Sequence, residues 1–253
     1  MPLTPATLRV KLIDRASRYF QTAGHFAYYF ARGKLGGDPM FLALLERCLL
    51  PDHARILDLG CGQGLLAAWL LAARQQFDTG EWPSGWPEPS RPADVRGVDL
   101  LARDIRRASA ALPSPARFEQ GDMRYVDFAQ ADVVVIMDAL HYVDFTAQND
   151  VLRRVRAALP PGGLFLTRVG NADAGLGFRL SNWVDRTVAY FRGNRLPPLH
   201  CRPLPEWVGS LEALGFSVET AAMNGSLPFA NVMLIARLSG EVPRLESTAT
   251  PDK

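Results

Sequence analysis

The residues of this chain best suited to chemistry are one acid and three glycines that follow a short apolar run. Residues 55–64 read RILDLGCGQG, with Asp58 two positions before Gly60 and further glycines at Gly62 and Gly64. Glycine lacks a Cβ, so the backbone of such a turn can lie against a ligand and adopt conformations closed to other residues. A carboxylate beside the turn would repel a pyrophosphate and suits a ligand that carries positive charge.

Polar residues also follow three later apolar segments. They occur in Gly97-Val98-Asp99-Leu100, in Gln120-Gly121-Asp122-Met123 and in Asp138-Ala139-Leu140-His141-Tyr142. Ligands of open parallel sheets bind in the crevice at the carboxyl ends of the strands. If each segment ends a strand, these side chains gather around the glycine turn. A histidine at that edge can take a proton from a nucleophile near neutral pH.

The elements that position these residues follow from the apolar pattern, which alternates between strand-like and helix-like segments. Strands are expected at residues 55–59, 94–98, around 117–119, 131–137, 164–169, 216–222 and 231–238. Helices are expected within 6–50, with a break at 33–39, and at 64–76, 101–111, 147–159 and 205–214, with a further helical pattern near 178–192. Residues 77–93 are rich in glycine and proline and indicate an irregular loop.

Taken together, the motifs resemble those of the class I S-adenosylmethionine-dependent methyltransferases of the small-molecule type, over about residues 50–238. The resemblance implies an α/β fold with a Rossmann-like seven-stranded sheet, strand order 3-2-1-4-5-7-6, strand 7 antiparallel, and an N-terminal helical cap. It divides the chain into a cap (1–50) and a core (51–238) with an insert at 77–93 and a substrate cover at 170–203. The polar tail, 239–253, is expected to be disordered.

The cofactor implied by this resemblance is S-adenosylmethionine, which has no phosphate and offers a cationic amine, a sulfonium and a ribose diol. The resemblance assigns cofactor contacts to Asp58, Gly60, Cys61, Gly62, Gly64, Asp99, Leu100, Asp122, Met123 and Asp138. In it, Asp99 accepts hydrogen bonds from both ribose hydroxyls. Asp122 accepts the adenine amine while Met123 packs on the ring, and Asp138 lies beneath the methionine moiety and the reacting methyl group.

The reaction implied is methyl transfer, in which the sulfonium already activates the methyl group. The protein has to align nucleophile, methyl and sulfur and exclude water. A general base is needed only when the nucleophile arrives protonated and weakly acidic. His141 is the candidate base, and Tyr142 is a second candidate catalytic residue. The alternative is that His141 only shapes the pocket.

Other interpretations of the same motifs stay open at this point. Residues 62–67, GQGLLA, also fit the dinucleotide pattern G-x-G-x-x-A, which would make the protein an NAD(P)-dependent oxidoreductase. Asp58 and the lack of a Tyr-x-x-x-Lys pair argue against that enzyme class, and a non-catalytic cofactor-binding module is a third alternative. Asp58 or Asp122 could cap local structure instead. Asp99 could be an ordinary turn residue, because 41 residues separate it from Asp58 where about 20 are usual.

Composition limits the protein's partners and location. Hydrophobic residues make up 48% of the chain and the formal net charge is +2, which requires no nucleic-acid partner. Cys48, Cys61 and Cys201 form no CxxC pair, which argues against a disulfide framework or a zinc site, and we expect no metal. The sequence shows neither a signal-peptide apolar region nor an apolar run of membrane length, so we expect a cytoplasmic protein.

The expected acceptor is a small metabolite, with O- or C-methylation favoured. Residues 170–203 combine aromatic and basic side chains, namely Trp183, Tyr190, Phe191, Arg179, Arg186, Arg192 and Arg195. That composition suits an apolar or aromatic small molecule with an anionic group, or one carried on a phosphopantetheine arm. The alternative is an amphipathic helix whose arginines lie in water.

Overall fold

Strands and helices alternate along the chain, as the apolar pattern predicts. The strands are β1 (Arg55–Leu59), β2 (Asp94–Asp99), β3 (Ala116–Gln120), β4 (Val133–Met137), β5 (Leu164–Gly170), β6 (Phe216–Ala222) and β7 (Asn231–Leu238). The helices are α1 (Pro5–Arg18), α2 (His25–Gly37), α3 (Pro39–Glu46), α4 (Leu65–Asp78), α5 (Ala102–Ala111), α6 (Phe145–Ala158) and α8 (Leu204–Glu212), with short 3-10 turns η1 (Tyr19–Gln21) and η2 (Leu140–Tyr142).

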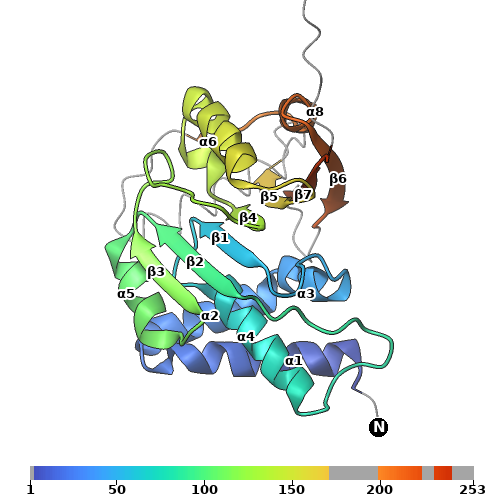
Figure 1. Ribbon diagram of the computed structural model, residues 1–253. Coiled ribbons are helices and arrows are strands. Elements are labelled where there is room, and N and C mark those ends of the chain that lie inside the picture. The colour runs from blue at the N-terminus through green and yellow to red at the C-terminus, as the bar shows by residue number, and fades with distance from the viewer. Residues whose placement is uncertain (1–2, 171–198, 224–230, 241–253) are drawn as a thin grey trace, which may run out of the picture.

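These strands form one seven-stranded sheet in a computed structural model that describes residues 3–170, 199–223 and 231–240 (Figure 1). The strand order is β3-β2-β1-β4-β5-β7-β6. Strands β1 to β5 pair in parallel, whereas β7 runs antiparallel to both β5 and β6. The predicted sheet is confirmed, including its antiparallel strand. The helical pattern near 178–192, most of the expected substrate cover and most of the polar tail lie outside the described residues.

Helices cover both faces of the sheet, and each face has its own apolar core. Helices α1 to α4 share one core with the side chains of Ile56 and Val135, which point to the same face of β1 and β4. Helices α6 and α8 cover the other face, where Leu57 and Val134 point. Figure 1 shows the two groups of helices on opposite sides of the sheet. Because side chains alternate along a strand, Asp58 points with Ile56 toward the face that α1 to α4 cover.

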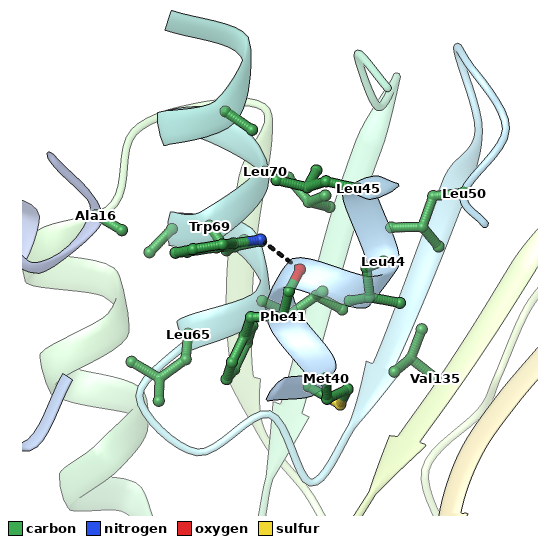
Figure 2. Packing of buried hydrophobic residues seen from close by; sticks show 14 of the residues in the cluster. Ala16, Met40, Phe41, Leu44, Leu45, Leu50, Leu65, Trp69, Leu70 and Val135 are labelled. Atoms are coloured by element: carbon green, nitrogen blue, oxygen red, sulfur yellow. Dashed lines mark hydrogen bonds between the residues drawn. The ribbon is translucent and has the colours of Figure 1, made fainter. Parts of the chain in front are cut away.

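The N-terminal helices are fixed to α4 and to the glycine turn by buried hydrogen bonds as well as by apolar packing. The indole nitrogen of Trp69 in α4 donates to the carbonyl of Phe41 in α3 at 2.7 Å (Figure 2). The amide nitrogen of Gln63, within the glycine turn, donates to the carbonyl of Ala27 in α2 at 2.8 Å. Both donors are buried, and each N–H finds an acceptor inside the core. The glycine turn is therefore tied directly to the helices that cover it.

The expected helix break at residues 33–39 is only partly correct. Helix α2 continues through Gly33 and Gly37, and the chain changes direction at Asp38, whose side chain caps α3. An earlier break falls at Gly24, with a φ of 101°. Glycine costs a helix roughly 1 kcal/mol. The inner face of α2, including Ala27 and Leu35, is fully packed, and this packing outweighs the cost.

The long connection between α4 and β2 leaves the sheet intact. The predicted irregular loop, 77–93, begins two residues later than expected because α4 continues to Asp78, and residues 79–93 form the rest of it. Strand β2 begins at Asp94 beside Arg55 of β1. Asp58 therefore pairs with Gly97, and Asp99 ends β2 two residues further along. The position of Asp99 at the carboxyl edge is confirmed in spite of its distance from Asp58 in the sequence. Within the described residues, no helix is long and apolar enough to cross a membrane.

Gly97→Ala should destabilise the protein because β2 has no room for a methyl group at this position. A Cβ on Gly97 would lie 2.5 Å from Phe118 Cδ1 and 2.9 Å from Cys61 Sγ. Overpacking of this kind costs about 1–3 kcal/mol. Urea unfolding of Gly97→Ala measures the loss. In Gly209→Ala, at an exposed position of α8, a Cβ meets nothing within 4 Å, so that variant should gain about 0.5–1 kcal/mol. Equal effects of the two substitutions would contradict this account of Gly97.

Candidate active site

The glycine turn connects the end of β1 to α4 and is hydrogen-bonded to the end of β2. The backbone N–H of Gly60 donates to the Val98 carbonyl at 2.8 Å, and that of Gly62 donates to Asp99 Oδ2 at 2.8 Å. Gly64, with a φ of 82°, is the N-cap residue of α4. The three predicted glycines thus form one turn at the carboxyl edge of the sheet.

At Gly60, the turn meets the end of β4 at close range. A Cβ on Gly60 would lie 2.7 Å from the Cβ of Ala139, and Met123 Cε is the next nearest atom, at 3.9 Å. The φ of Gly60 is +78°, a conformation that favours glycine. The structure therefore brings three of the predicted segments together here, from the ends of β1, β3 and β4.

Asp58 is a buried carboxylate at the base of this turn, with 5% of its surface exposed. No donor in the described part of the chain forms a hydrogen bond with its side chain. Burial, with a contribution from the charge of Asp99, raises the pKa of Asp58 to about 7. A carboxylate without donors is costly to ionise in a low-dielectric environment, and a nearby cation lowers that cost. It does not cap α4, since Gly64 occupies that position.

Asp99 is the second acid at the turn, and both of its oxygens accept backbone hydrogen bonds. Oδ2 accepts the N–H of Gly62 and Oδ1 that of Leu101, each at 2.8 Å. These bonds orient the carboxylate at the rim of the turn, and the ribose contact assigned to it stays a prediction. The next residue, Leu100, is 61% exposed and extends from the same rim.

Cys61 lies within the turn and is buried. Burial, together with the charges of Asp58 and Asp99, raises the pKa of its thiol well above the ordinary value. A thiol that stays protonated is a poor nucleophile. Cys61 therefore serves as a small side chain in the turn.

Asp122 and Met123 follow β3 in a loop that α6 holds in place. The carboxylate of Asp122 accepts the N–H of Arg124 at 2.9 Å and also pairs with the Arg124 guanidinium at 2.6 Å. The guanidinium of Arg154 in α6 donates to the carbonyls of Met123 at 2.8 Å and of Arg124 at 2.9 Å. Asp122 thus organises its own turn, and Met123 is the member of the pair that reaches the glycine turn. The adenine contact assigned to them stays a prediction.

Asp138, at the end of β4, belongs to an ion cluster that the sequence analysis missed. Its carboxylate is paired with the guanidinium of Arg168 in β5, with Nε to Oδ1 at 2.7 Å, and lies 3.4 Å from Lys34 Nζ of α2. Arg168 Nη1 also donates to Asp38 Oδ1 at 2.6 Å, and Lys34 Nζ lies 3.1 Å from Asp38 Oδ2. Two acids and two bases therefore join the covering helices to the ends of β4 and β5.

The charges of this cluster balance, so its acids stay ionised although Asp38 is buried and Asp138 is half-buried. Burial by itself would raise the pKa of Asp138, but Arg168 and then Lys34 hold it well below the ordinary value. Burial would also raise the pKa of Asp38, but the opposing effect of Arg168 is larger, so the pKa of Asp38 is lowered. The Asp138 carboxylate is engaged in this cluster, and its backbone has a φ of 54°. The residue fixes the turn that leads to His141.

His141 and Tyr142 lie in η2, directly after this turn. Their rings are 4.3 Å apart, and Nε2 of His141 is buried without a hydrogen-bond partner in the described residues. Burial lowers the pKa of His141, and the charge of Asp138 opposes the shift only in part. The imidazole is therefore neutral near pH 7, in the state a proton acceptor needs.

The amino-acid sequence matches a known protein family. The sequence matches the methyltransferase domain family over residues 30–220, about three quarters of the chain. The chain belongs to this family. It is a class I S-adenosylmethionine-dependent methyltransferase by sequence family and by fold, and the alternative of a dinucleotide-dependent oxidoreductase is not supported.

Solved structures with the same fold include S-adenosylmethionine enzymes. The magnesium protoporphyrin IX methyltransferase of Synechocystis, crystallised with S-adenosylhomocysteine, is 16% identical with a TM-score of 0.56, and the match covers 89% of this chain and 94% of that one. An S-adenosylmethionine-dependent methyltransferase of Mesorhizobium loti is 22% identical with a TM-score of 0.52, and the match covers 76% of this chain and 94% of that one. At these identities the likeness shows the fold alone.

Curated relatives share the amino-acid sequence over a shorter stretch. Carboxy-S-adenosyl-L-methionine synthase of Aliivibrio fischeri is 27% identical over 128 residues, which is 49% of this chain and 47% of that protein. The corresponding synthase of Chromohalobacter salexigens is 28% identical over 130 residues, 49% of this chain and 43% of that protein. This methyltransferase therefore aligns with about half the length of the curated relatives it matches.

The raised pKa of Asp58 predicts a specific dependence of stability on pH. The folded protein holds this proton more tightly than the unfolded chain does, so the free energy of unfolding should fall as pH rises from about 4 to 7, by up to roughly 1.4 kcal/mol per pH unit. Asp58→Asn removes the ionisation and should flatten this part of the profile. Urea unfolding of both proteins from pH 5 to 8 measures the difference. Parallel profiles would show that Asp58 does not titrate in this range.

Arg168→Met should destabilise the protein strongly, because it leaves two carboxylates without their main partner. Removing one member of a buried ion cluster costs about 3–5 kcal/mol. Arg55→Met is the matched control, since Arg55 pairs with Asp132 at the surface, where its side chain is 50% exposed. That substitution should cost only about 0–1 kcal/mol. The comparison is made by urea unfolding at pH 7, and similar losses for both variants would contradict the role given to Arg168.

Proposed function

We propose that this protein transfers a methyl group from S-adenosylmethionine to a small organic acceptor. The observation that carries the proposal is the pairing of a glycine turn with two acids, Asp58 and Asp99, at the carboxyl edge of the sheet. Both acids suit a ligand with a cationic amine and a ribose diol, and neither suits a pyrophosphate. The family to which the chain belongs uses this cofactor.

In this proposal each side chain around the turn takes one part of the cofactor. The buried carboxylate of Asp58 faces the amine, whose charge would favour the ionised form. Asp99 accepts the ribose hydroxyls, Met123 packs beside the adenine, and the turn at Asp138 lies below the methionine part. The remaining predicted contacts are made by Gly60, Cys61, Gly62, Gly64, Leu100 and Asp122 in the walls of the same site.

In the methyl-transfer step, the main contribution of the protein is to align the acceptor with the methyl group. S-adenosylmethionine supplies an activated methyl group when bound, and the chain's own residues hold the acceptor in line with it. We assign to Nε2 of His141 the proton that an alcohol or phenol acceptor loses, because this nitrogen is neutral, buried and without a partner in the described residues. Tyr142, whose ring packs on His141, supports the imidazole or contacts the acceptor.

The proposal extends to the class of the methyl acceptor. We propose a small apolar or aromatic acceptor, with O- or C-methylation. The arginines first expected to recognise an anionic group or a carrier-bound chain lie in residues 171–198, outside the described residues. Helices α1 to α3 form the proposed cap, because they cover the face to which Asp58 points.

S-adenosylhomocysteine should raise the melting temperature of the protein, and NAD should not. A ligand at about 100 times its Kd stabilises the folded state by roughly 2.7 kcal/mol. Asp99→Ala should weaken S-adenosylhomocysteine binding by about 1.5–3 kcal/mol, measured by calorimetric titration. Asp94→Ala, at the opposite end of β2, is the matched control and should bind normally. Micromolar binding of NAD with no response to S-adenosylhomocysteine would overturn the proposal.

The product formed from the cofactor distinguishes methyl transfer from the reaction for which the curated relatives are named. After incubation with phenols, carboxylic acids and carrier-bound acyl chains, mass spectrometry should detect S-adenosylhomocysteine together with a methylated acceptor. A carboxylated cofactor instead would indicate the synthase reaction.

A further inference from the structure

A second set of buried polar residues lies beside the loop that carries His141, and it centres on Gln148 in the first turns of α6. The side chain of Gln148 is fully buried. Its amide nitrogen lies 3.1 Å from the carbonyl oxygen of Leu140, 3.0 Å from that of Val143 and 2.8 Å from that of His200. The amide nitrogen of Gln148 therefore contacts the carbonyls at both ends of η2. It also contacts a carbonyl from a segment about 50 residues further along the chain.

Arg202 fixes the orientation of this amide. Its Nε donates to Gln148 Oε1 at 2.7 Å, and its Nη2 donates to the Phe145 carbonyl at 2.9 Å and to Asn149 Oδ1 at 2.8 Å. A guanidinium has only donors and the three carbonyls are only acceptors, so the amide of Gln148 can be satisfied in one orientation alone. Only 4% of Arg202 is exposed, and its guanidinium also lies over the ring of Trp207.

The main chain of His141 is held within the same set of contacts. The backbone N–H of His200 donates to the carbonyl of His141 at 2.9 Å. The carbonyls of Leu140, His141 and Val143 are thus each held by a hydrogen bond, two from Gln148 and one from His200. These contacts restrict the backbone of η2, and so limit the directions in which the imidazole can point.

We propose that Gln148, oriented by Arg202, is the positioning residue for His141. It does not contact the reactants, and acts by holding η2 against residues 199–203. This rests on the proposed function, in which His141 faces the acceptor. A merely structural role predicts a loss of stability alone. A positioning role predicts in addition a change in the surroundings of the His141 ring.

The test compares Gln148→Met with Gln76→Met, because both glutamines are fully buried and both accept a hydrogen bond from an arginine Nε. Gln76 lies in α4, remote from η2 in the sequence and on the other face of the sheet. The readouts are unfolding in urea, calorimetric binding of S-adenosylhomocysteine and the pH titration of the histidine ring signals by NMR. The chain has four histidines, so each signal is assigned with one substitution.

In Gln148→Met, the His141 signal should shift and its pKa should rise toward the ordinary value as burial is relaxed, with Asp138 still the acid acting on it. Binding of S-adenosylhomocysteine and the signals of His25 and His53 should be unchanged. Gln76→Met should lose stability without moving His141. Should Gln148→Met fail to fold, Gln148→Glu retains the oxygen that faces Arg202 and places a second one against the three carbonyls.

An unmoved His141 signal in a folded Gln148 variant would overturn the proposal. That failure is distinct from a failure of the proposed function, which would be revealed by the wild-type protein not binding S-adenosylhomocysteine. The ring signal of His141 can be followed in either case.

Discussion

The rest of the site depends on the carboxylate of Asp99, which accepts the N–H groups of Gly62 and Leu101 at the same time. One acceptor pair thereby joins the turn after β1 to the start of the helix after β2. The backbone bond from Gly60 to Val98 fixes the first residue of the turn against β2, and the Asp99 carboxylate extends that attachment to Gly62. The approach of Gly60 to Ala139, which brings in the end of β4, needs that position to be fixed within a few tenths of an ångström.

The carboxylates around the glycine turn differ in whether a cation neutralises their charge. In the cluster of Lys34, Asp38, Asp138 and Arg168, every carboxylate has a cation within 3.4 Å, and the acids remain ionised. Asp58 has no such partner in the described residues, and burial raises its pKa to about 7. The paired cluster serves the architecture, whereas the unpaired acid is the one in a position to respond to a ligand.

Local patterns in the sequence were sufficient for the strands, the glycine turn and the acids that follow them. Asp99 could be located across a long insert because β2 has its own apolar alternation and is independent of the loop before it. The ion cluster could not be predicted in this way. Arg168 pairs with Asp38 across 130 residues, and nothing near Arg168 in the sequence distinguishes it from a surface arginine. Gln148 and Arg202 could not be predicted for the same reason. The helix break at 33–39 was placed wrongly because the packing of α2 outweighs the low helix propensity of its glycines.

Helix α6 forms hydrogen bonds with both the loop after β3 and the loop after β4. Gln148 holds the loop after β4, and Arg154, six residues later, holds the carbonyls of the loop after β3. In the proposed function the two loops contact different parts of the cofactor, and hydrogen bonds from α6 restrict them both. A small translation of this one helix would shift both loops together. Under the proposed function, cofactor binding and proton acceptance would then both depend on how closely this one helix packs against the sheet, because packed interiors transmit strain.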